Sequence, residues 1–387
     1  MISRTIAAIF VLLIVSWTAN GQSFPLKIAT AYDDECWNIA ENPQGGYFLE
    51  ISQGTFESSA LMYLRYHDVI YKIDNAGSIT DSIVFYDSDT LYFRINRMFL
   101  TQEKLLLYSV VHDPEHLQNT LGIRLTVMDY DLNIIHDTLL FKPGYYWRPI
   151  PNPTINHSGN LVIPGVPIQI SGNNWYNSMD EISINGDIVL ETILDFNIPL
   201  GSIIELPAAG GYHLLDLANI VFVDSIFENA YSVFHLSPLD TLRPLAGYKA
   251  INDSLYIISG QTSEPRPLYA GVGFDLGFGV YNKDGQWSKI HQFGVMYTDE
   301  YPGPFDFIST DRIFFSMRQD YIVPNEICVY NYKMDGTLNW NRCYGQYQYI
   351  APTALAATSD GGCILVGTYQ TENSGYNEYD LVVMKLN

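Results

Sequence analysis

The chain has 387 residues and a formal net charge of −22, with 29 tyrosines, 29 glycines and 19 prolines. This charge disfavours nucleic acid and anionic membrane surfaces as partners, because both are bound through Lys/Arg surfaces. Tyrosine, together with many Ile, Val and Thr residues, favours strands, while glycine and proline favour turns. No long stretch beyond the N-terminus has the apolar spacing of an amphipathic helix. The composition therefore predicts an all-β protein.

Residues 1–21 have the features of a cleaved secretory signal peptide. Arg4 precedes an apolar run over residues 6–17, which is shorter than the about 20 residues needed to span a bilayer. Ala19 and Gly21 are the small residues that precede a cleavage site. We expect a mature protein of residues 22–387 without a membrane span, secreted or located in the periplasm or at the cell surface.

A unit of apolar strand, turn and second apolar strand recurs about every 53 residues, close to the period of propeller blades. "NIAENPQGGYFLEISQG" (38–54) and "ALAATSDGGCILVGTYQ" (354–370) show it most clearly. The second strand of each unit is the more apolar one, which is typical of a strand buried on both faces. The seven turns centre near Gly46, Lys104, Gly159, Gly211, Ser254, Arg312 and Gly362.

Six further turns alternate with these seven along the chain. Asn185-Gly186, Asp284-Gly285 and Asp335-Gly336 are dipeptides typical of two-residue hairpin turns, which need positive φ. Each unit therefore contains two hairpins and hence four antiparallel strands. Seven such units predict one domain over residues 22–387, a seven-bladed β-propeller of four-stranded blades.

The last eight residues, "DLVVMKLN" (380–387), form the third strand of the seventh unit and have no fourth strand after them. The segment "FPLKIATAYDD" (24–34) lacks a hairpin before it and compares with the fourth strands of other units. We expect residues 24–33 to pair with the C-terminal strand and close the ring, since an unpaired edge promotes aggregation. The alternative is a truncated chain.

The segment "DGGCILVGTYQTENSGYNEYDLVVMKLN" (360–387) resembles a repeat of secreted β-propellers from Bacteroidetes-like bacteria. That repeat combines DGG, an apolar strand ending in Gly, and D-x-x-V-x-K-L-N/D. "KMDGTLNWNRCYG" (333–345) and "NKDGQWSKIHQFG" (282–294) are similar to its continuation, D-x-x-G followed by W and YG. The resemblance implies an exported propeller. It implies no single activity, because one fold hosts many functions.

The chain has four cysteines, Cys36, Cys328, Cys343 and Cys363, and an exported protein allows disulfides. Cys328 and Cys343 are symmetric about the turn at Asp335-Gly336. They are therefore predicted to face each other at a hydrogen-bonded pair, about 5.5 Å apart at Cα, within disulfide range. No C-x-x-C spacing points to a metal, and we predict no metal site and no cofactor.

Two aromatic segments around the third unit are candidate binding loops. They are "PGYYWRPIP" (143–151) and "SGNNWYN" (171–177), and aromatic side chains bury large areas at recognition sites. Packing between neighbouring blades is the alternative interpretation. The candidate binding residues are Tyr145, Tyr146, Trp147, Trp175 and Tyr176.

No signature of an enzyme is present, neither G-x-S-x-G, H-E-x-x-H, a phosphate-binding glycine loop nor a dinucleotide fingerprint. The sequence favours a binding module for a protein or glycan partner, with specificity carried by the loops that join the second and third strands of the blades. The alternative is a hydrolase or lyase acting on polysaccharide, with acidic residues near the central channel. Converging acidic or histidine side chains would indicate the enzyme, and an exposed aromatic patch the binding module.

Overall fold

The computed structural model describes most of residues 22–387, and the predicted signal peptide (1–21) lies outside the described residues. No helix within the described part is long and apolar enough to cross a membrane. The described ranges are 22–30, 32–57, 62–86, 91–101, 103–113, 120–142, 145–149, 153–169, 177–194, 202–206, 210–215, 219–235, 242–252, 254–265, 272–282, 287–293, 299–320, 325–347, 350–370 and 379–387.

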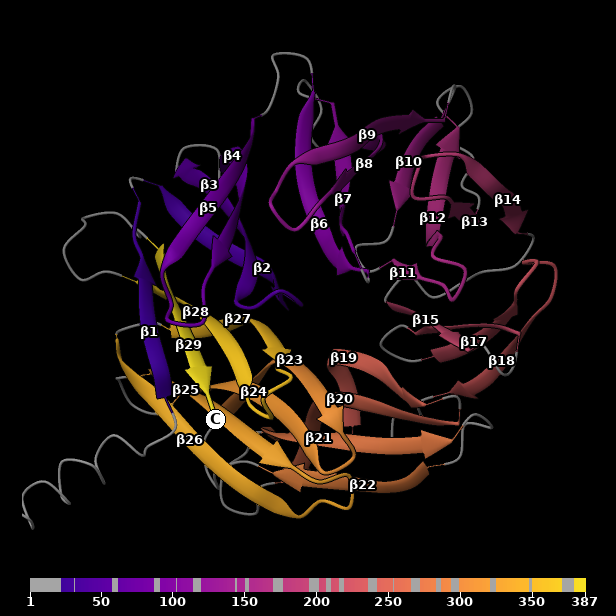
Figure 1. Ribbon diagram of the computed structural model, residues 1–387. Helices are drawn as coiled ribbons and strands as arrows, with labels where there is room; N and C mark the ends of the chain where they lie inside the picture. The colour runs from indigo at the N-terminus through magenta and orange to yellow at the C-terminus, as the bar shows by residue number, and fades with distance from the viewer. Residues whose placement is uncertain are drawn as a thin grey trace, which may run out of the picture.

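Seven antiparallel sheets, the blades, are arranged in a ring (Figure 1), which confirms the predicted all-β, seven-bladed propeller. The innermost strands of blades 1 to 7 are β2 (Asp33–Glu41), β6 (Tyr92–Leu100), β10 (Tyr145–Pro149) with β11 (Thr154–Ile155), β15 (Ser202–Leu206), β19 (Leu242–Asn252), β23 (Asp299–Ser309) and β27 (Ile350–Ala357). The second strands are β3 (Tyr47–Glu57), β7 (Leu105–His112), β12 (Leu161–Gln169), β16 (Gly211–Leu215), β20 (Leu255–Pro265), β24 (Arg312–Asp320) and β28 (Cys363–Gln370).

The outer half of each blade follows the same order. The third strands are β4 (Met62–Ile73), β8 (Thr120–Met128), β13 (Asn177–Ile182), β17 (Asn219–Asp224), β21 (Val272–Asn282), β25 (Asn325–Tyr332) and β29 (Tyr379–Leu386). The outermost strands are β5 (Ile79–Tyr86), β9 (Ile134–Phe141), β14 (Ile188–Leu194), β18 (Ala230–His235), β22 (Trp287–Phe293), β26 (Leu338–Tyr347) and, for blade 7, β1 (Gln22–Ile28).

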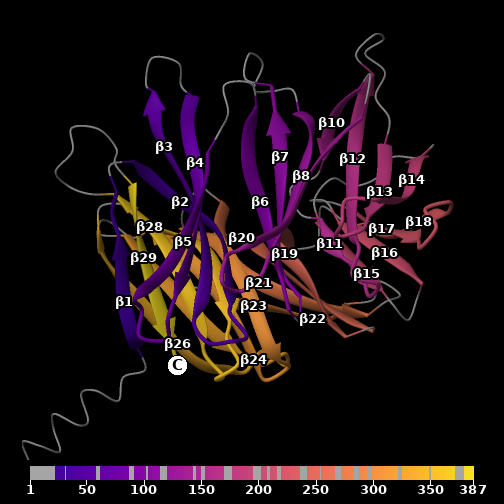
Figure 2. The same cartoon turned by 45° about the horizontal axis from the view of Figure 1, so that its top comes forward.

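The ring is closed by β1 and β29, the first and last strands of the chain. They pair antiparallel, from Gln22 opposite Leu386 to Ile28 opposite Leu381, and both views show them side by side (Figures 1 and 2). Closure by the N-terminal strand is thus confirmed. The predicted bounds, residues 24–33, are wrong because the pairing ends at Ile28 and Asp33 already begins the innermost strand of blade 1.

The hairpin turns differ from the predicted two-residue type. In the turn at residues 183–187, the Gly186 N–H donates to the Ser183 carbonyl at 2.9 Å and the Ser183 N–H to the Asp187 carbonyl at 2.8 Å. Gly186 has a φ of 87°, while Asn185 keeps a negative φ. This is a longer loop that ends in one left-handed residue, which also suits the strand twist. The turn at residues 333–337 has the same two hydrogen bonds, and Asp284-Gly285 lies outside the described residues.

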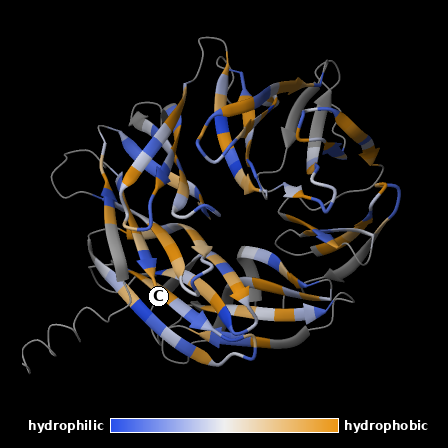
Figure 3. Cartoon of the chain, viewed as in Figure 1, coloured by the Kyte–Doolittle hydropathy of each residue, from blue (hydrophilic) through white to orange (hydrophobic). Residues whose placement is uncertain are grey.

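The core lies between neighbouring blades. Strands β7 and β28 are buried along all but their last residue, which confirms that the second strand of these units is buried on both faces. One core cluster joins blade 7 to blade 1 and contains Leu49 and Ile51 of β3 with Ile364 and Val383. Hydrophobic residues accordingly occur in all parts of the ring (Figure 3). Each blade is therefore stabilised chiefly by its neighbours.

A double-cysteine variant tests the closure, because Leu26 of β1 lies directly opposite Val383 of β29. We expect Leu26→Cys with Val383→Cys to form an intramolecular disulfide, detected as a cross-linked peptide pair by mass spectrometry. Each single variant is the control. A monomer in which both thiols stay reduced under oxidising conditions would contradict the pairing.

Candidate functional site

The innermost strands surround a central cavity of about 590 Å³. All seven blades contribute to its lining, so the cavity exists only in the closed ring. Pockets of this size hold small ligands or short segments of larger ones. The lining includes one residue of each blade that represents its innermost strand. In the order of blades 1 to 7 these are Trp37, Arg97, Thr154, Ile204, Lys249, Asp306 and Thr353.

Several innermost strands carry a β-bulge beside the cavity. The register shifts between Cys36 and Asn38 in β2 and between Ile95 and Arg97 in β6, which makes Trp37 and Asn96 the extra residues. A bulge turns a side chain away from the regular alternation of a strand. In β2 it turns the side chain of Trp37 towards the cavity.

Trp37 is the large aromatic side chain that this bulge presents. It lines the cavity and is 45% exposed. The guanidinium of Arg94, on β6, lies 5.8 Å from the centre of its ring, a cation–π arrangement. An exposed indole in a concave site provides a flat apolar face for stacking. The sequence does not single out Trp37 as a site residue, because the position of a bulge depends on how the neighbouring strands pack.

An ion pair connects three blades across the cavity wall. Lys249 Nζ of β19 lies 2.6 Å from Asp306 Oδ1 of β23. The second oxygen of Asp306 accepts a hydrogen bond from the Ala357 N–H of β27 at 2.8 Å. Both carboxylate oxygens are thereby engaged, so Asp306 holds blades 5, 6 and 7 at fixed spacing.

Arg97 of β6 is the second cation in the lining. Its side chain is partly buried, and burial lowers the pKa of Arg97 while the negative charge of Asp306 opposes this effect. Among the described residues, none accepts a hydrogen bond from its guanidinium. A charged group in such surroundings is costly unless it is paired.

A buried carboxyl lies apart from the cavity, near the seam between blades 7 and 1. Asp34 is fully buried and accepts hydrogen bonds from Gln53 Nε2 at 2.8 Å and from the Thr30 N–H at 3.2 Å. Burial raises the pKa of Asp34 to about 6, although the hydrogen bonds from Gln53 and Thr30 oppose the rise. Thr30 belongs to the short link between β1 and β2, so Asp34 fixes that link.

The predicted aromatic sites are placed only in part. Tyr145, Tyr146 and Trp147 lie in β10, paired with β12, so their prediction as a loop is wrong. Aromatic residues favour the extended backbone of a strand, and this preference accounts for a strand at residues 145–149 in place of the predicted loop. Their side chains, and all of Trp175 and Tyr176, lie outside the described residues, and their role in binding stays a prediction.

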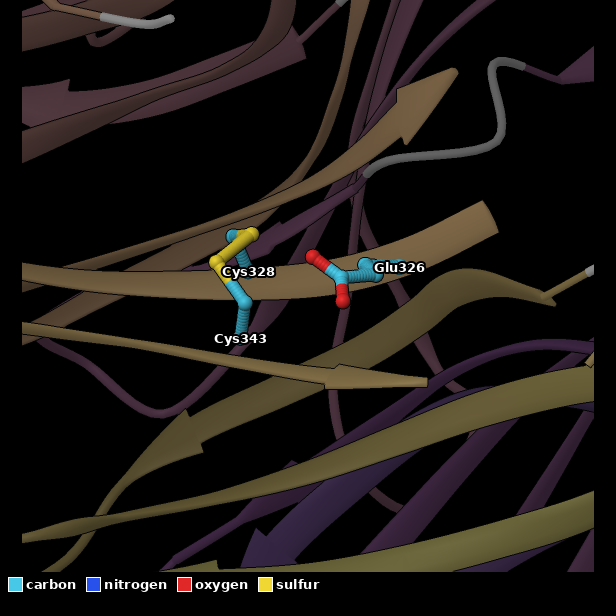
Figure 4. A group of neighbouring side chains, drawn as sticks. All are labelled: Glu326, Cys328 and Cys343. Carbon is cyan, nitrogen blue, oxygen red and sulfur yellow. A yellow bond between two sulfur atoms is a disulfide. The ribbon is translucent and has the colours of Figure 1, made fainter. Parts of the chain in front are cut away.

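Cys328 and Cys343 are joined by a disulfide between β25 and β26 (Figure 4). Their Cα atoms are 4.0 Å apart, closer to a non-hydrogen-bonded pair than to the predicted hydrogen-bonded one. The longer turn at residues 333–337 shifts the alternation by one. A bulge in β26 after Leu338 brings Cys343 opposite Cys328 again. Glu326 lies near both sulfurs, but sulfurs bonded to each other are not thiolates and do not form a metal site with it.

No protein-family model and no curated protein matches the chain. Among solved structures, it is similar to a protein of unknown function from Dyadobacter fermentans, with 10% identity, a TM-score of 0.48, and 94% of this chain and 98% of that chain covered. It is also similar to the β-propeller domain of the Trilobed protease from Pyrococcus furiosus, with 7% identity, a TM-score of 0.49, and 92% and 94% covered. At these identities the likeness concerns the fold alone.

Replacing Asp306 tests its role in linking the blades. We expect Asp306→Ala to lower the free energy of unfolding by about 1–2 kcal/mol, because it leaves Lys249 and the Ala357 N–H without their partner. Asp306→Asn keeps an acceptor for Ala357 and should cost less, as should Lys249→Ala. Denaturant unfolding measures all three. Equal losses of stability in all three variants would show that the hydrogen bond from the Ala357 N–H to Asp306 contributes nothing to the free energy of unfolding.

The raised pKa of Asp34 predicts a specific pH dependence. From pH 4 to pH 6 the native state keeps this proton longer than the unfolded state, so its contribution to stability falls as pH rises, by about 3 kcal/mol. Asp34→Asn removes this contribution, so the variant should gain stability relative to the parent over this window.

The control for this experiment is Asp129→Asn. Hydrogen bonds from Asn133 lower the pKa of the exposed Asp129, so its contribution is present above the unfolded pKa and is lost as pH falls. Because that loss occurs below the ordinary pKa of 3.8, Asp129→Asn should differ from the parent by a nearly constant amount from pH 4 to pH 7. Unfolding curves at pH 4, 5, 6 and 7 measure both differences. A pH-independent difference for Asp34→Asn would contradict the assignment.

Proposed function

We propose that the chain is an exported binding module that holds a glycan in its central cavity. Trp37 carries this proposal, because an exposed indole beside charged side chains suits a ligand with both an apolar ring face and polar groups. Sugars have this character, and aromatic side chains with a few polar groups fix the orientation of ligands in such sites. A protein segment is the second candidate partner.

The chemistry of the lining supports binding over hydrolysis. Glycoside hydrolysis generally uses two carboxyl groups about 5–9.5 Å apart, one on each side of the scissile bond. Asp306 is the one acidic residue among the described residues of the lining. Its two oxygens are already engaged by Lys249 and the Ala357 N–H. This favours a binding module over the alternative hydrolase or lyase.

Export is part of the proposal. The signal-peptide features of residues 1–21 and the resemblance of residues 360–387 to secreted bacterial propellers support it. The disulfide between Cys328 and Cys343 fits an oxidising compartment. A mature protein in the periplasm, at the cell surface or outside the cell would meet glycans there.

The proposal is tested by screening residues 22–387 against a set of oligosaccharides by thermal shift, followed by calorimetry on the ligands that bind. We expect Trp37→Ala to weaken binding at least about fivefold, since stacking on an aromatic ring contributes about 1 kcal/mol or more. Tyr86→Ala is the matched control, because Tyr86 is 69% exposed on the outermost strand of blade 1. Equal affinities of parent and Trp37→Ala would contradict binding in the cavity.

A further inference from the structure

We propose that Arg97 binds a carboxylate of the ligand, so that the cavity selects acidic saccharides, those that contain uronic acid residues. This inference rests on the proposed function and names the class of its ligand. It is carried by the charge of the lining, by the state of each charged group and by the positions of Trp37 and Arg97.

The sign of the charge in the cavity differs from that of the whole chain. Its described lining carries two cations, Arg97 and Lys249, and one anion, Asp306, whereas the chain has a formal net charge of −22. The acidic composition of the chain does not explain why the lining of the cavity has a net positive charge. Binding of an anionic group of a ligand explains it.

The two cations are not equivalent. Lys249 is neutralised by Asp306 at 2.6 Å, and the other oxygen of that carboxylate is held by the Ala357 N–H. The N–H groups of the Arg97 guanidinium are accordingly available to a ligand, because no described residue accepts a hydrogen bond from them. Guanidinium groups bind carboxylates through two parallel hydrogen bonds, a geometry that an ammonium group cannot provide.

Trp37 and Arg97 lie at the same level along the axis of the ring, on the innermost strands of the neighbouring blades 1 and 2. Asn38, directly after Trp37, accepts a hydrogen bond from the N–H of Met98, directly after Arg97, at 3.4 Å. Asn38 Nδ2 also donates to the Asn96 carbonyl at 3.4 Å. These bonds fix β2 against β6 where both bulges occur. A sugar ring stacked on Trp37 therefore places a carboxylate substituent within reach of the neighbouring strand that carries Arg97.

The competing explanation is structural, with Arg97 serving only as a distant counter-charge to Asp306. The free protein distinguishes the two. If Arg97 awaits a ligand, then Arg97→Met removes an uncompensated charge, and Tm should rise by about 2 °C. If Arg97 is a counter-charge, Tm should fall. A fall in Tm overturns the inference without any ligand.

The binding experiment uses calorimetry with trimers of galacturonate, glucuronate and mannuronate and with their methyl esters, which keep the skeleton and remove the charge. We expect at least one acid to bind at least tenfold more tightly than its ester. Arg97→Gln should bind acid and ester alike, at the affinity of the ester. Arg97→Lys keeps the charge but loses the paired hydrogen bonds and should be intermediate.

The outcomes separate this inference from the proposed function. Binding of neutral saccharides that depends on Trp37, with no preference for acids, overturns the role of Arg97 and leaves the binding module standing. Preference for an acid that persists in Arg97→Gln also overturns it. Absence of binding by every saccharide, neutral or acidic, overturns both proposals.

Discussion

The pairing of β1 with β29 is the constraint on which the molecule depends. It joins residues more than 350 positions apart in sequence. The entropic cost of closing a loop grows only slowly with loop length, so this large separation does not prevent the pairing. Once blade 7 is complete, it packs against blade 1 through Leu49, Ile51, Ile364 and Val383. The link that follows β1 is then held by the buried Asp34. Because the innermost strands of all seven blades line the cavity, its shape depends on blades 7 and 1 lying side by side.

The sequence predicts the architecture well because its signals are local and repeated. The seven turns and the unmatched "DLVVMKLN" are enough to infer seven blades and the closing strand. The turn type was wrong at Asn185-Gly186, because such dipeptides suit both a two-residue turn and the longer turn with one left-handed glycine. The same longer turn at residues 333–337, together with the bulge in β26 after Leu338, explains why Cys328 and Cys343 face each other at the other kind of pair.

The cavity is harder to foresee, since it assembles from seven segments about 50 residues apart. Trp37 and Arg97 are found there because of bulges in β2 and β6, and a bulge is set by the packing of adjacent blades. The aromatic residues that stand out in the sequence, Tyr145, Tyr146 and Trp147, belong to a strand and not to a loop.

Residue-resolved hydrogen exchange of the free protein over Leu381–Leu386 tests the closed ring most directly. In an antiparallel strand, successive amides point to opposite neighbours, so alternate amides of β29 bond to β28 and to β1. The closed ring predicts slow exchange for both sets, at rates like those of β28. Fast exchange at every second amide of β29, with β28 still protected, would show that β1 is not in place and would contradict the account.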